Sequence, residues 1–109
     1  MQGNREEVAE YFYDKAAAQM DKSGVGIHEV SDPEKTGKGG NWLALYLQTA
    51  AHQTEMRVYG PRFIQFRVWR PFMGKKGNAQ SIIFKTVEGA DKFFEESLIR
   101  GIWTGKLAP

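Results

Sequence analysis

The stretch RFIQFRVWR, from Arg62 to Arg70, decides the fold because its side chains alternate in kind from one residue to the next. Successive side chains on a β-strand point to opposite faces of the sheet. As a strand, the stretch places Ile64, Phe66 and Val68 on one face. An ordinary half-buried strand would place polar groups on the other face, which here receives an aromatic and cationic mixture. Its members are Phe63, Gln65, Arg67 and Trp69.

The same period of two predicts three more strands, at Trp42 to Gln48, Thr54 to Tyr59 and Gln80 to Lys85. Gly60-Pro61 is a turn signal too short for anything but an antiparallel hairpin into Arg62 to Arg70. These three strands turn apolar side chains inward: Leu43, Leu45, Leu47, Met56, Val58, Ile82 and Phe84.

A period of four before the strands predicts a helix over residues 1–24. Asn4 is suited to cap it, Glu6 and Glu7 lie in its first turn, and Gly24 can end it. Its apolar stripe consists of Val8, Tyr11, Phe12, Ala16 and Met20.

A second helix follows the strands over residues 86–100, capped by Thr86 and ended by Gly101. Ala90, Phe93, Phe94 and Leu98 form its apolar stripe. Between the first helix and the sheet, Val25 to Val30 is a candidate short strand and residues 31–41 a glycine-rich loop. The expected fold is therefore α+β: an N-terminal helix, an antiparallel meander of four or five strands (residues 25–85) and a C-terminal helix, with a tail at 101–109.

Composition is that of one globular domain. The chain has 109 residues, 41% hydrophobic and 26% charged, and no apolar run approaches the roughly 20 residues of a membrane span. It has no cysteine, which excludes disulfides and thiolate metal sites. No secretory signal is visible, so we expect an intracellular protein.

Charge is distributed unevenly along the chain, although the net charge is only +2. Residues 1–35 carry four basic and eight acidic side chains, whereas residues 36–85 carry eight basic ones and a single acid, Glu55. Such a basic block favours an anionic partner such as nucleic acid, although a short chain can also reach this asymmetry by chance.

The strand face turned away from the leucines, here called the second face, collects aromatic and basic residues. Aromatic rings stack on unpaired bases, and Arg and Lys neutralise phosphates. Lys75 and Lys76, in a predicted loop at its edge, are placed to hold a nucleic-acid backbone. The predicted second face comprises Trp42, Tyr46, Arg57, Tyr59, Phe63, Gln65, Arg67, Trp69 and Lys85.

The alternative is that this face is covered, by a helix or by a second molecule, and forms another core layer. Tyr and Trp tolerate burial when their polar atoms find partners. Against this stands the cost of burying Arg57, Arg67 and Lys85 in a block with one acid. The acidic first helix could supply their partners, so both interpretations stay open.

Catalytic and metal-binding patterns are not evident. His28 and His52 have no ligand spacing, and the glycine-lysine stretches at 37–40 and 74–77 lack the spacing of a phosphate-binding loop. No Ser/His/Asp set or carboxylate pair emerges, so we expect neither an enzyme nor a cofactor.

The stretch FIQFRVWRPFMGKKGNAQSIIFKTVEGADKFFEESL, from Phe63 to Leu98, resembles the last hairpin and helix of the Whirly and positive cofactor four group of single-stranded DNA-binding proteins. The matching parts are a basic aromatic strand, a lysine and glycine loop, an apolar strand and a capped helix. This resemblance implies a curved antiparallel sheet, assembly into at least a dimer, and single-stranded DNA lying over the sheet.

The chain departs from that group in its long first helix, which stands before the sheet. Arg67 to Gly77 also resembles the tryptophan-glycine-arginine domain of DNA-break enzymes, although Arg70-Pro71 follows Trp69 where the glycine is expected. Both resemblances imply DNA as the partner.

The sequence leaves three functions open for this protein. The first is binding of single-stranded DNA or RNA, with DNA favoured although a stacking surface accepts both. The five rings of the second face would stack on bases, and its three cations, Lys75 and Lys76 would contact phosphates. The second is a protein-interaction or assembly module whose aromatic face is buried in a homodimer or against a partner. The third is an enzyme with a small-molecule pocket on that face, for which the sequence offers no acid, base or nucleophile.

Overall fold

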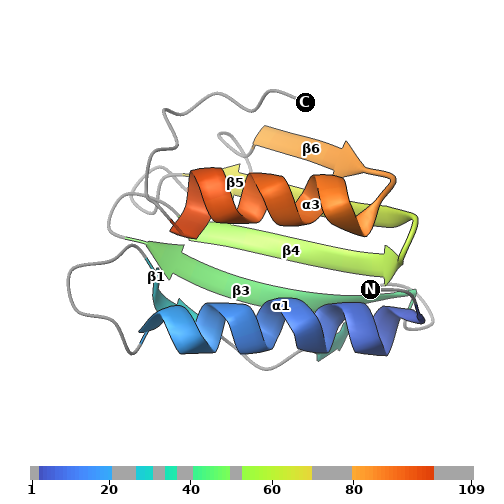
Figure 1. Ribbon diagram of the computed structural model, residues 1–109, viewed down its shortest axis with the longest axis horizontal. Coiled ribbons are helices and arrows are strands. Elements are labelled where there is room, and N and C mark those ends of the chain that lie inside the picture. Colours follow the sequence, from blue (N-terminus) through green and yellow to red (C-terminus); the bar gives the residue numbers. More distant parts are fainter. Residues whose placement is uncertain are drawn as a thin grey trace.

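A computed structural model describes residues 3–20, 27–30, 34–36, 41–49, 53–69 and 80–99 of the chain. Two helical segments enclose a run of strands in sequence (Figure 1). The elements are α1 (Arg5–Met20), β1 (Ile27–Val30), β2 (Glu34–Thr36), β3 (Trp42–Thr49), β4 (Gln53–Gly60), β5 (Phe63–Trp69), β6 (Gln80–Phe84), α3 (Val87–Phe93) and the π-helix η2 (Phe94–Ile99).

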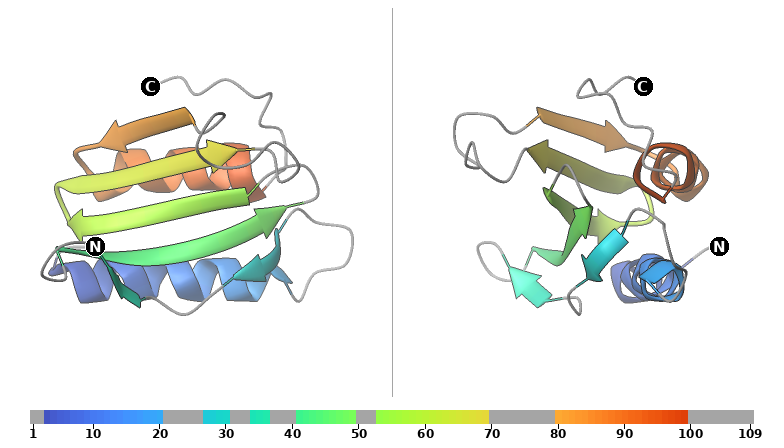
Figure 2. Two further views of the ribbon diagram at one scale, coloured as in Figure 1. Left: turned by 180° about the vertical axis from the view of Figure 1, so that it is seen from behind. Right: turned by 90° about the vertical axis from the view of Figure 1, so that its left-hand side faces the viewer.

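The strands form one antiparallel sheet in the order β1-β3-β4-β5-β6, and β2 also pairs with β3. From β3 onward, each strand pairs with the next in the sequence, so this part is a meander. Both α1 and α3 lie on the same side of the sheet, which the end-on view in Figure 2 shows directly. The protein therefore has two layers, helices over a sheet.

The core lies between these two layers. It contains inward side chains of β3, β4 and β5 and, from α1, Val8, Phe12 and Ala16, which are all fully buried. Phe66 of β5 lies at its centre, 4.9 Å from the ring of Phe93 and 5.8 Å from that of Phe84, measured between centroids. Because both helices contribute to one cluster, the core fixes which face of the sheet they cover.

Both helices begin at the capping residues that the sequence predicts. The Asn4 side chain accepts a hydrogen bond from the Glu7 backbone N–H at 2.9 Å, and Thr86 Oγ1 accepts one from Gly89 N–H at 3.0 Å. Each satisfies a donor that the first turn of a helix leaves without a partner.

The structure confirms the α+β class, the meander, and the placement of the two helices before and after the sheet. It differs from the sequence-based prediction in two details. The predicted loop at 31–41 contains the short strand β2, which raises the sheet to six strands, and the second helix changes to a π-helix at Phe94. Gly24, Gly101 and the tail lie outside the described residues.

Candidate functional site: the second face of the sheet

The second face lies on the side of the sheet opposite α1 and α3 (Figure 2). The registers of β3 to β6 place its residues in rows that run across the strands, and side-chain contacts link many of them into three bands. One band is aromatic, the middle one is ionic and the third carries amide groups. The three bands therefore differ in the kind of contact that each can make.

The aromatic band takes one residue from each of three strands. Trp42 of β3 lies 5.3 Å from Tyr59 of β4, and Tyr59 lies 4.6 Å from Phe63 of β5, centroid to centroid. Phe63 is 39% exposed, and Trp42 and Tyr59 are half-buried. The guanidinium of Arg57 lies over the Trp42 ring, with Cζ 4.5 Å from its centroid. The exposed edge of this band is therefore Phe63.

The ionic band is centred on Glu55, which is only 2% exposed. Arg67 Nη1 donates a hydrogen bond to Glu55 Oε1 at 3.0 Å, and the Tyr46 hydroxyl donates one to Oε2 at 3.1 Å. Arg57 Nε lies 3.1 Å from the same Oε1, but its N–H is not directed at the oxygen, so this contact is an ion pair alone. One buried carboxylate thus holds both arginines, which satisfies the requirement that a buried charge be paired.

The third band is a chain of side-chain hydrogen bonds across β5, β4 and β3. Trp69 Nε1 donates to Gln53 Oε1 at 3.0 Å, and Gln53 Nε2 donates to Gln48 Oε1 at 3.5 Å. Trp69 is 8% exposed, so little of its ring is open to a ligand. We therefore assign Trp69 a supporting position rather than a stacking one.

The structure brings together most of the residues that the sequence predicts for this face. Gln65 is half-buried beside Arg57 in the β4–β5 register, and Tyr46 is 36% exposed above Glu55. Lys85 is exposed directly after β6. Lys75 and Lys76 lie outside the described residues.

Glu55 is the site residue that sequence reasoning missed. Alternation places it on the same face of β4 as Arg57, two positions away, and the β4–β5 register places it opposite Arg67. The alternative in which the acidic first helix supplies the partners is wrong, because α1 lies on the other side of the sheet (Figure 2). The signal that could have found Glu55 was its position as the one acid of residues 36–85.

On the helix side, an ionic contact joins α1 to α3 and η2. Lys15 Nζ lies 2.6 Å from Asp91 Oδ1 and 2.5 Å from Glu95 Oε2. Burial lowers the pKa of Lys15, but the close Asp91 and Glu95 carboxylates outweigh it and leave the pKa above its usual value. The Tyr11 hydroxyl donates to Asp91 Oδ2 at 2.7 Å, and this hydrogen bond, with burial, raises the pKa of Tyr11.

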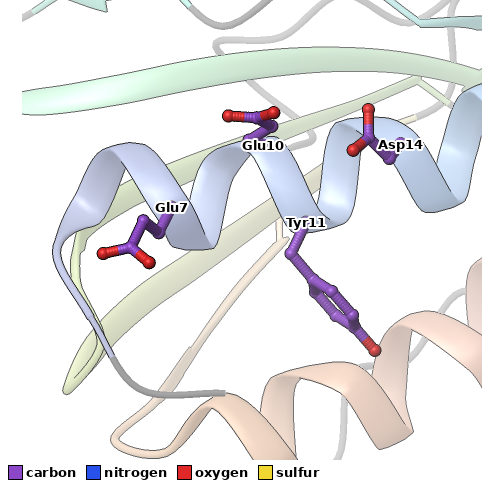
Figure 3. Close-up of a pocket in the computed structure, with 4 residues that line it drawn as sticks. All are labelled: Glu7, Glu10, Tyr11 and Asp14. Atoms are coloured by element: carbon purple, nitrogen blue, oxygen red, sulfur yellow. The ribbon is translucent and has the colours of Figure 1, made fainter.

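A shallow pocket on α1 is lined by Glu7, Glu10, Tyr11 and Asp14. Figure 3 shows the Tyr11 ring directed toward α3, while the three carboxylates belong to turns of α1 itself. All three carboxylates are exposed, so the pocket repels phosphate. It cannot contribute to an anion site.

Within the described ranges, no three His, Cys, Asp or Glu side chains converge on a point where a metal ion could bind. The described helices include none with the length and apolar character needed to cross a bilayer.

Fold and face together define a two-layer α+β domain with an aromatic and arginine-bearing sheet surface. Comparison with known proteins adds no relative: no protein-family model, curated protein or solved structure matches the chain.

Proposed function

We propose that the protein binds single-stranded nucleic acid, DNA in the first instance, through the second face of its sheet and without catalysis. The observation that carries the proposal is the position of both helices on the opposite side, which leaves a sheet surface with rings and guanidinium groups beside each other. The resemblance of Phe63 to Leu98 to single-stranded DNA-binding proteins supports the choice of DNA.

Stacking is assigned to the rings that are open on this face. Phe63 and Tyr46 are 39% and 36% exposed, and Tyr59 lies beside Phe63. A base stacked on an aromatic side chain contributes about 1–3 kcal/mol. Trp42 contributes less ring surface, because Arg57 lies over it. An unpaired base can reach these rings, whereas the bases of a duplex remain stacked within the helix.

Phosphate contacts are assigned to Arg57, Arg67 and Lys85, with Lys75 and Lys76 as further candidates. Arg57 and Arg67 are about four-fifths buried at their side chains, with 21% and 24% exposed. A guanidinium has five N–H donors, so each arginine retains donors beyond those used with Glu55. The affinity should fall with salt by roughly 0.7 decades per decade of salt for each phosphate neutralised.

The experiment is a titration of the protein with a fluorescently labelled thymidine oligonucleotide, followed by anisotropy at two salt concentrations, with a duplex of equal length beside it. We expect binding of the single strand, weaker binding of the duplex, and an affinity for the single strand that falls with salt. Phe63→Ala should weaken single-strand binding about 5- to 150-fold, which corresponds to the loss of one stacked base.

The matched control is Lys92→Ala, which removes an exposed cation from α3 on the opposite side of the molecule. It should leave single-strand affinity within about two-fold, because a distant exposed charge is screened by salt. A wild-type protein that does not bind the oligonucleotide at low salt would exclude this function, as would equal effects of the two substitutions.

A second function, a protein-interaction surface, is favoured by one observation. Ile83 of β6 is 46% exposed on the same face as Tyr46 and Phe63, and an aliphatic side chain offers a base no ring to stack on. Exposed apolar groups gathered on one face are typical of protein interfaces. Light scattering distinguishes the two: a stable dimer whose affinity falls on Ile83→Asp, with no oligonucleotide binding, supports the interaction module.

A further inference from the structure

The net positive charge on the strands of the second face is smaller than the number of arginines there suggests. On strands β3 to β6 the charged side chains of this face are Arg57, Arg67 and Glu55. Glu55 Oε1 lies 3.1 Å from Arg57 Nε and 3.0 Å from Arg67 Nη1, so a single carboxylate compensates one of the two cations. On these strands the face thus carries a net charge of one rather than two, and Lys85, directly after β6, adds a further exposed cation.

We propose that Glu55 determines the selectivity of this face for single strands over duplexes. The inference rests on the proposed function and names the residue that sets its specificity. A single strand gains affinity from stacking on Tyr46 and Phe63 and needs few phosphate contacts. A duplex offers mainly phosphates to such a surface, so its affinity follows the net charge there. The negative charge of Glu55 therefore weakens duplex binding more than single-strand binding.

The geometry keeps that charge in place under any ligand. The Glu55 side chain is 3% exposed and is held by the Tyr46 hydroxyl on one oxygen and the arginines on the other. It cannot turn away into solvent without losing these partners. A buried charge is also screened less by salt than an exposed one, so its effect extends to the ligand lying above it.

Glu55→Gln tests the proposal because it removes the charge and keeps the shape, and the amide oxygen can still accept from Arg67. The variant and the wild type are titrated with single-stranded oligonucleotide, with duplex and with inorganic polyphosphate at two salt concentrations. We expect affinity for duplex and polyphosphate to rise about five-fold, as for one partly screened ion pair, and affinity for the single strand to rise less. For each additional phosphate bound, the salt dependence should steepen by roughly 0.9 decades per decade for the duplex and roughly 0.7 for the single strand.

The control is Glu88→Gln, which makes the same change in net charge at an exposed position of α3, on the other side of the molecule. It should leave the ratio of single-strand to duplex affinity unchanged. If Glu55→Gln has the same ratio of single-strand to duplex affinity as the wild type, the role of Glu55 in selectivity is overturned. The proposed function stands in that case, because the wild type still binds the single strand. A wild type and a folded variant that both leave the single strand unbound would overturn the two together.

A second variant covers the case in which Glu55→Gln does not fold, as judged by circular dichroism. Arg67→Gln leaves Glu55 paired with Arg57 and removes the net positive charge that strands β3 to β6 carry on this face. Affinity for duplex and polyphosphate should then fall more than affinity for the single strand. Equal losses for all three ligands would overturn the proposal.

Discussion

At the scale of the residue, hydrogen-bonding caps determine where the helices begin. Thr86 has extended backbone angles, and its Oγ1 accepts the Gly89 N–H at 3.0 Å. The cap directs the chain from the edge strand β6 back over the sheet, so that Val87, Ala90 and Phe93 enter the core. A single hydroxyl thus helps to place α3 on the core side of the sheet.

Thr86→Ala should lower the free energy of unfolding by about 1 kcal/mol, because the Gly89 N–H loses its acceptor in the first turn. The midpoint of thermal unfolding, followed by circular dichroism, should fall by about 4 °C for a domain of this size. Thr86→Ser keeps the hydroxyl and should retain most of the stability. An equal loss in both variants would show that the hydroxyl does not carry the effect.

Residue patterns predicted the two faces of the sheet but not the pairing between side chains. The period of two placed Leu45, Met56 and Phe66 inward, where all three are fully buried. The pairing of Glu55 with Arg67 depends on the β4–β5 register. The hairpin sets that register, and an irregularity between Val58 and Gly60 displaces it by one residue. Alternation alone does not contain that information.

At the scale of the element, α1 and α3 are joined by more than their shared core. Lys15 of α1 contacts Asp91 of α3 and Glu95 of η2, and Tyr11 donates to Asp91. Asp91 lies 76 residues along the chain from Lys15 and 80 from Tyr11. Amphipathic spacing predicted each helix by itself, whereas these contacts depend on both helices lying on one side, which spacing does not specify.

This contact predicts how stability varies at alkaline pH. The folded pKa values of Lys15 and Tyr11 lie above their unfolded values of 10.5 and 10.0, so the folded state holds protons that the unfolded state releases above about pH 10. The stability that these groups add is complete below that pH and is lost as pH rises through the folded pKa values.

Lys15→Met should therefore lower the free energy of unfolding by about 1 kcal/mol at neutral pH and flatten its decline above about pH 10. Urea unfolding at a series of pH values measures both effects. Lys92→Met removes an exposed lysine of α3 and serves as the control, with a decline like that of the wild type. Identical pH profiles for Lys15→Met and the wild type would contradict the contact's role.

At the scale of the whole molecule, the two sides differ in charge. The exposed carboxylates of α1, at Glu7, Glu10 and Asp14, lie on the helix side, and the arginines of β4 and β5 lie on the sheet side. A polyanion is repelled from the first and attracted to the second. The uneven charge along the sequence predicted that such a difference exists, and only the common side of the two helices shows where it lies.

Chemical-shift mapping tests the central claim most directly. A uniformly labelled sample is titrated with single-stranded thymidine oligonucleotide, and the backbone amide and indole signals are followed. We predict shifts concentrated on β3, β4 and β5, with the Trp42 indole and the residues around Phe63 and Arg67 among them, while α1 and α3 remain unchanged. Shifts confined to the helix side, or none at saturating oligonucleotide, would contradict the account.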